Sequence, residues 1–231
     1  MPATHEQPSL LRGDLAIALD DSDSPLRVLV VDDHPAVRMG LRELFEDQPD
    51  FVVVAAVESA DAAMALAERE PIDVAVVDYQ LGSRNGLWLS RKLKRLAQPP
   101  RVVIYSAYCD GPLAATSVVA EADGLVSKGG VGADLCEAVR AVAHGQVRLP
   151  AVPPALASAL RRRLEAEEQA IFGMLLAGIP AAEISVMLNI SSASLESRLW
   201  TMLRKLEALP NDSVAVRRAR PHNGRRRGSP I

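Results

Sequence analysis

The clearest pattern in the chain is an alternation of short apolar runs with longer segments of helical periodicity. The apolar runs are RVLVV (27–31), FVVVAAV (51–57), VAVV (74–77), RVVIY (101–105) and GLVS (124–127). Helical periods follow near 36–48, 59–70, 86–97, 111–121 and 132–144. Because the runs are continuous, the strands should be covered on both faces, as in a parallel sheet between helices. We therefore expect an α/β domain of five βα units, and we assign its sheet the flavodoxin-like strand order 2-1-3-4-5.

The pattern changes after residue 145. The segment GQVRLPAVPPAL places three prolines and a glycine together, which indicates a linker over 146–158. Beyond it only helical periods occur, and Gly178 and Pro180 are suited to a helix stop and a helix start. The last helix carries one apolar face of Leu195, Leu199, Met202 and Leu206. Two helices joined by a short turn predict a small all-α helix-turn-helix domain over 159–209.

The two ends of the chain are interpreted as extensions. Residues 1–26 include LDDSDSP, which is too polar for a core, and we expect a disordered N-terminal extension. Residues 210–231 are expected to form a basic disordered tail. No stretch reaches the roughly 18 apolar residues of a membrane span, and the N-terminus lacks the order of a secretion signal. We expect a cytoplasmic protein without membrane association.

Charge and cysteine content narrow the picture. The first 150 residues carry 22 acidic and 14 basic side chains, whereas 151–231 carry 7 and 12. The helical segment 159–209 holds six of each, so the basic excess lies in the tail, for which solvation is the simpler interpretation. Cys109 and Cys136 lie far apart, and the four histidines are scattered, which indicates neither a thiol pair nor a zinc site.

Acidic residues directly follow two of the apolar runs. Asp32 and Asp33 end the first, and Asp78 ends the third. In a doubly wound sheet of flavodoxin-like order, ligands bind between the carboxyl ends of the first and third strands. Two carboxylates about 4 Å apart repel by about 4 kcal/mol at an effective dielectric of about 20, so three in one cleft need a cation. Carboxylate oxygens predict Mg²⁺ as that cation.

Two other polar residues end the fourth and fifth strands of the predicted sheet. Ser106 closes the fourth strand and Lys128 the fifth. A hydroxyl and an ammonium group in the same cleft could hold phosphoryl oxygens, which favours phosphoryl transfer to a carboxylate. Each residue alone would be interpreted as an ordinary loop residue, but five at strand ends in this order indicate a site.

With these residues, the sequence over roughly 27–145 resembles the receiver domain of two-component response regulators. The resemblance implies that Asp78 accepts a phosphoryl group from a histidine kinase, and that Ser106 and Lys128 bind its oxygens. It also implies that the metal site consists of Asp33, Asp78 and the backbone carbonyl of Gln80, with Asp32 acting mainly through water. The chain departs from this family at Leu125, where an aromatic switch residue is usual, and at Gly82, where proline is common.

The block LEAEEQAIFGMLLAGIPAAEISVMLNISSASLESRLWTMLRKL resembles the LuxR-type helix-turn-helix output domain. Together the two resemblances imply a transcription regulator that forms a homodimer on activation. With the apolar face of the last helix inward, Trp200 and Arg204 point outward and Glu196 lies at the edge, so only one cation is available for phosphates. The candidate DNA contacts are Ala193, Ser194, Glu196, Ser197, Trp200, Thr201 and Arg204.

This shortage of cations leaves an alternative open. The same receiver could control an output that binds a protein partner, for which an outward tryptophan is a usual anchor. Trp200 could also be an ordinary core or rim residue. A phosphatase with its aspartate nucleophile on the first strand is disfavoured, because no acid stands two residues after Asp32 or Asp33. We therefore expect no enzyme.

Overall fold

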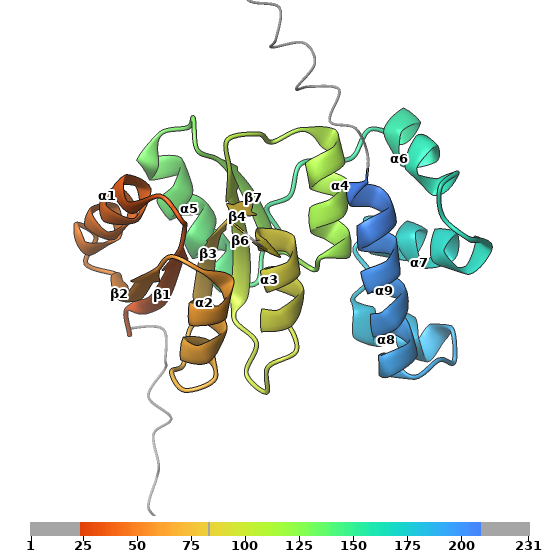
Figure 1. Ribbon diagram of the computed structural model, residues 1–231, viewed down its shortest axis with the longest axis horizontal. Coiled ribbons are helices and arrows are strands. Elements are labelled where there is room, and N and C mark those ends of the chain that lie inside the picture. The colour runs from red at the N-terminus through yellow and green to blue at the C-terminus, as the bar shows by residue number, and fades with distance from the viewer. Residues whose placement is uncertain (1–23, 83, 209–231) are drawn as a thin grey trace, which may run out of the picture.

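Residues 24–82 and 84–208 are described by a computed structural model of the chain (Figure 1). The main sheet contains β1 (Leu26–Val31), β2 (Phe51–Val57), β3 (Val74–Asp78), β6 (Arg101–Ser106) and β7 (Gly124–Ser127). Its order is β2-β1-β3-β6-β7, and all neighbouring strands are parallel. The predicted order is confirmed once the short hairpin of β4 (Gln80–Leu81) and β5 (Arg84–Asn85) is left out of the count.

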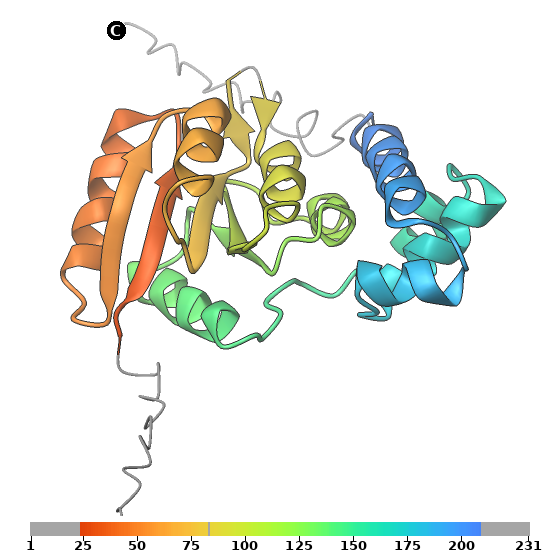
Figure 2. The same cartoon turned by 90° about the horizontal axis from the view of Figure 1, so that it is seen from below.

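Helices cover both faces of the sheet (Figure 2). Helices α1 (Pro35–Glu46) and α5 (Gly132–Ala143) lie on one face. The other face is covered by α2 (Ala60–Ala67), α3 (Gly86–Leu93) and α4 (Gly111–Val119). Successive residues of a strand enter opposite cores, so that Val30 belongs to the same cluster as Phe45, while Leu29 belongs to the same cluster as Leu87. Both faces of each strand must therefore be apolar, as the continuous runs predict.

The C-terminal part consists of α6 (Pro154–Arg161), α7 (Ala166–Leu176), α8 (Ala181–Met187) and α9 (Ser192–Glu207). Gly178 has a φ of 80°, the left-handed conformation expected after α7, and α9 begins where the Ser191 hydroxyl accepts a hydrogen bond from the Ser194 amide. Helix α6 begins inside the segment predicted as linker, because proline is well suited to a first helical turn.

The predicted tail 210–231 lies outside the described residues, as does the predicted extension 1–26 apart from its last three residues. The domain boundaries inferred from the sequence stay a prediction. Within 24–82 and 84–208, no helix has both the length and the apolar character needed to cross a bilayer.

Helix α4 connects the sheet with the C-terminal helices (Figure 1). Six of its nine residues are buried, and it contacts α6, α7 and α9 on the side away from the sheet. An added Cβ on Gly111 would lie 2.6 Å from Cδ2 of Leu156 in α6, which shows how closely the two helices approach. One apolar cluster therefore extends from Leu29 in the sheet through Leu113 to Phe172 and Leu199. A helix without a charged face, such as GPLAATSVV, is typical of burial between two layers.

Candidate functional site

The first candidate site lies at the carboxyl ends of β1 and β3. Asp32 and Asp78 are 1% and 4% exposed, whereas Asp33 is partly exposed. One possible ligand atom from each of Asp32, Asp33, His34 and Asp78 lies within 4.8 Å of the others. The structure thus brings the three predicted acids together and adds His34, whose ring nitrogen Nδ1 is 2.7 Å from Asp33 Oδ1.

A single ammonium group joins the two buried acids. Lys128 Nζ donates a 2.6 Å hydrogen bond to Asp32 Oδ2 and is 3.0 Å from Asp78 Oδ1. The Lys128 amide donates to the Ser106 carbonyl, and the buried Ser106 hydroxyl accepts from the Tyr108 amide. Gln80 follows at the start of β4. All the residues predicted for this site therefore lie at one edge of the sheet.

Burial and the neighbouring charges together shift the pKa values of Asp78 and Lys128. It raises the pKa of the Asp78 carboxyl, the hydrogen bond from Lys128 lowers it, and the nearby Asp32 charge raises it again, for a net rise. Burial lowers the pKa of Lys128, but its bonds to Asp32 and Asp78 raise it further, so its net shift is upward. Three acids outnumber this one ammonium group, and their oxygens are hard donors, so the cluster could hold a metal ion.

The hairpin that follows Asp78 leads directly into α3. Gly82 turns it with a φ of 53°, a value that proline cannot adopt, which accounts for the departure from the usual proline. An added Cβ on Gly86 would lie 2.3 Å from the Asp78 carbonyl oxygen, so α3 must begin with glycine at this point. Asn85 caps α3 by accepting a 2.8 Å hydrogen bond from the Trp88 amide.

The sequence and the fold match those of known regulatory proteins. The family described as "Response regulator receiver domain" matches residues 28–140. The chain is 27% identical over 206 residues to "Nitrate/nitrite response regulator protein NarL" of Escherichia coli K12, covering 84% of this chain and 95% of NarL. A crystal structure of a LuxR-family two-component response regulator from Aurantimonas sp. SI85-9A1 is 30% identical, has a TM-score of 0.52, and is matched over 58% of this chain and 94% of its own.

The chain belongs to the response regulator family. This response regulator is also 26% identical to "Transcriptional regulatory protein LiaR" of Bacillus subtilis 168, covering 85% of this chain and 98% of LiaR. It therefore combines a receiver domain with a LuxR-type output and belongs among regulators of transcription.

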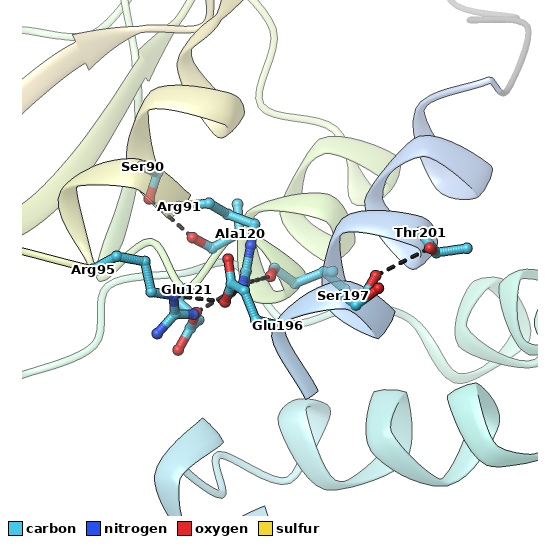
Figure 3. Close-up of polar contacts among 9 residues, drawn as sticks. Ser90, Arg91, Arg95, Ala120, Glu121, Glu196, Ser197 and Thr201 are labelled. Carbon is cyan, nitrogen blue, oxygen red and sulfur yellow. Dashed lines mark hydrogen bonds and ion pairs between the residues drawn. The ribbon is translucent and has the colours of Figure 1, made fainter. Parts of the chain in front are cut away.

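The second candidate site of this response regulator is the contact between the receiver and helix α9 (Figure 3). At one end, Glu196 accepts a hydrogen bond from Arg91 and lies 2.6 Å from Arg95 Nε. In the middle, the rings of Trp88 and Trp200 pack with centroids 6.5 Å apart. At the other end, Asn85 Nδ2 donates a 2.6 Å bond to Glu207.

The contacts along α9 follow one helical face. Positions 196, 200, 203 and 207 recur at the spacing of a single stripe, and Leu203 is buried. We call Glu196, Trp200, Leu203 and Glu207 the receiver-facing stripe. It runs beside the apolar stripe predicted from the sequence, whose members Leu195, Leu199, Met202 and Leu206 are all buried. Helix α9 thus contacts the helix-turn-helix core on one side and the receiver on the other.

This arrangement corrects one prediction about the candidate DNA contacts. The sequence predicts that Trp200 points into solvent, with Glu196 at the edge of the same outward face. That prediction is wrong, because both side chains are partly buried against α3. Periodicity identifies the inner face of a helix but not the position of another domain. Of the other candidates, Ala193, Ser197 and Arg204 are exposed, and Ser194 and Thr201 are partly buried.

Arg91 is the centre of this contact and is wholly buried. Its guanidinium donates to the Val119 carbonyl at 3.0 Å. It also donates to Glu121 at 2.8 Å and to Glu196 (Figure 3). Burial lowers the pKa of Arg91, whereas the charges of Glu121 and Glu196 raise it. The buried cation is therefore sustained by carboxylates from two separate segments.

The sequence patterns did not indicate Asn85, Trp88, Arg91, Arg95 or Glu121 as functional residues. Two signals were present: α4 has no charged residue, and Glu196 is an acid among candidate DNA contacts that include only one cation. Together these features are typical of a covered surface.

Arg91→Ala should lower the free energy of unfolding by about 3–5 kcal/mol, because it removes a wholly buried cation, leaves the Val119 carbonyl without its donor, and leaves Glu121 and Glu196 with only the more exposed Arg95. Urea denaturation measures this change. Arg42→Ala is the matched control, since Arg42 is 47% exposed and 3.8 Å from Glu46, and it should cost less than about 1 kcal/mol. Equal losses in the two variants would contradict the role of Arg91.

Glu207→Gln should change how the contact responds to pH. Burial raises the pKa of Glu207 above its ordinary 4.5, although the bond from Asn85 lowers it. We call the form with α9 docked on the receiver the closed form. Because its Glu207 pKa is raised, the closed form binds a proton on Glu207 more tightly than a form in which α9 has left the receiver. Closure should strengthen as pH falls from the raised value towards 4.5, and weaken as pH rises. Hydrogen exchange of α9 against pH measures this, and identical profiles for the wild type and Glu207→Gln would refute it.

Proposed function

We propose that the protein accepts a phosphoryl group on Asp78 from a histidine kinase and thereby controls transcription through its helix-turn-helix domain. The observation that carries this proposal is the burial of Asp78 at the end of β3, beside Asp32 and 3.0 Å from Lys128 Nζ. In the transfer, an Asp78 oxygen forms the new bond to phosphorus. The bond from phosphorus to the donor breaks, and its electron pair leaves with the donor.

The other residues of the cluster are assigned roles around this step. Asp33, Asp78 and the Gln80 carbonyl would bind Mg²⁺, with Asp32 acting mainly through water. The ion would supply positive charge for the phosphoryl oxygens. Ser106 and Lys128 are assigned to those oxygens. Lys128 already lies between the two buried acids, so it is placed to balance the charge that phosphorylation adds. Asp78 keeps the group that it receives, and we propose no enzymatic turnover.

The output follows from the position of α9. While α3 covers Glu196 and Trp200, the helix cannot present its full candidate surface to DNA. We propose that phosphorylation weakens this contact, that the released domains bind DNA, and that activated chains pair as homodimers. The names of NarL and LiaR, a response regulator and a transcriptional regulatory protein, support this output.

A second output is favoured by one specific observation. Glu196 and Glu207 of the receiver-facing stripe bind Arg91, Arg95 and Asn85, and Trp200 packs against the Trp88 ring at an interplanar angle of 47°. This stripe already has the chemistry of a protein-binding surface. The alternative function is therefore an output that binds a protein partner in place of DNA.

Incubation with Mg²⁺ and acetyl phosphate should label the wild type, and Asp78→Asn should abolish the label. Asp61→Asn is the matched control, because Asp61 lies exposed on α2 and should leave the label unchanged. Asp33→Ala should raise the Mg²⁺ concentration that half-maximal labelling needs. Intact-mass measurement gives the phosphate incorporated by each variant. A label that survives Asp78→Asn would place the acceptor elsewhere.

Glu196→Lys should increase binding to a random-sequence DNA duplex pool several-fold with little change in sequence preference. It removes the ion pairs with Arg91 and Arg95 and adds a cation for phosphate. Ser197→Ala, on the exposed face, should instead alter the selected sequences. Gel shift and sequencing of the bound pool measure both effects.

The same experiment separates the two outputs. Binding of duplex DNA by the phosphorylated wild type at low salt supports the transcription-factor output. A phosphorylated wild type that binds no duplex, beside a Glu196→Lys variant that does, would favour the protein-binding output.

A further inference from the structure

Each chain carries two surfaces that fit each other. The α3 side presents the cations Arg91 and Arg95 beside Trp88, and the receiver-facing stripe presents Glu196 at the matching end. If the C-terminal helices move away, both surfaces become free in the same chain. In any two opened chains, the α3 side of each chain is therefore complementary to the receiver-facing stripe of the other.

Opening alone would leave costly surface uncovered. Helix α4 has few polar atoms to present to water, and the apolar cluster passes through it into α6, α7 and α9. Arg91 would also lose Glu196, one of its two carboxylate partners. Monomeric proteins rarely expose contiguous apolar patches of more than a few hundred Å². The opened form therefore needs an occupant for this face.

The hinge between the two parts is short and stiff. Arg148 is held to β7, because its amide donates to the Asp123 carbonyl at 2.7 Å and its carbonyl accepts from the Leu125 amide at 3.0 Å. Helix α6 begins at Pro154, so only residues 149–153 lie between this attachment and the helix, and they include Pro150 and Pro153. Short hinges under constraint favour exchange of an element between copies over refolding onto the same chain.

We infer that the partner for these surfaces is a second copy of this chain, which exchanges helices α6–α9 so that each α9 docks on α3 and α4 of the other copy. The exchanged pair repeats every contact of the closed chain under two-fold symmetry and needs no new surface. Helix α9 stays covered in this pair, which is therefore distinct from an activated dimer. Exchange needs no phosphorylation, so the inference does not depend on the proposed function.

Charge reversal in the full-length, unphosphorylated chain tests this exchange. Arg95→Glu and Glu196→Arg each place like charges across the contact within their own chain. When the two variants are mixed, an exchanged heterodimer contains one wild-type contact and one in which the two reversed residues meet. Light scattering should then show a species of twice the 24.8 kDa chain mass, several-fold more abundant than in either variant alone.

Two controls make the result specific. The double variant Arg95→Glu with Glu196→Arg regains the attraction between positions 95 and 196 within its own chain, so its dimer fraction should be lower than that of the mixed single variants. Arg204→Glu reverses an exposed charge on α9 outside the stripe, and its mixture with Arg95→Glu should not form the dimer. A mixture of the complementary variants that stays at the monomer mass overturns the inference, as does a dimer that forms equally with Arg204→Glu.

A hinge variant gives a readout that does not rely on charge reversal. Insertion of a flexible glycine-serine segment between Ala151 and Val152 should let the chain close on itself easily. The fraction of wild-type dimer at raised protein concentration should then fall several-fold. A dimer fraction that is unchanged by the insertion, or a wild-type chain that remains monomeric at every concentration, overturns the inference.

Discussion

The arrangement of the whole chain depends on one buried cation. Arg91 in α3 takes its acceptors from Val119 and Glu121 at the end of α4 and from Glu196 in α9, so three segments separated in sequence meet at one guanidinium. Glu121 adopts a φ of 56° at this point, a conformation unusual for a residue other than glycine. A buried charge of this kind is tolerated only while its partners stay in place. The position of the output domain is therefore tied to the interior of the receiver.

The acidic cluster and α9 are connected by a short stretch of chain. From Asp78 the backbone passes through the β4–β5 hairpin to Asn85, which caps α3 and binds Glu207. Gly86 packs directly on the Asp78 carbonyl, so a shift of that carbonyl must displace the start of α3. This connection does not pass through Leu125, which is buried in β7 where the family usually has an aromatic switch residue. A physical link between Asp78 and α9 therefore exists even though the aromatic ring is absent at position 125.

The receiver fold could be predicted from the sequence because its determinants are local. Continuous apolar runs indicate strands covered on both faces, and the order of the strands then places Asp32, Asp78 and Lys128 at one edge. The β4–β5 hairpin was not predicted, since strands of two residues carry no periodicity. The docking of α9 was not predicted either, because it depends on two surfaces meeting across a hinge. Glu196 and Trp200 looked anomalous as DNA contacts, and their partners on α3 supply the physical reason.

Helix α4 has a consequence for how this protein can be divided. Its sequence contains no charged residue, and its outer side is packed by α6, α7 and α9 as its inner side is packed by the sheet. A receiver fragment that ends in the linker would keep the complete acidic cluster but would present this apolar helix to water. Such a fragment would self-associate or bind chaperones and hydrophobic dyes, and its oligomeric state would reflect the cut rather than the phosphorylation chemistry.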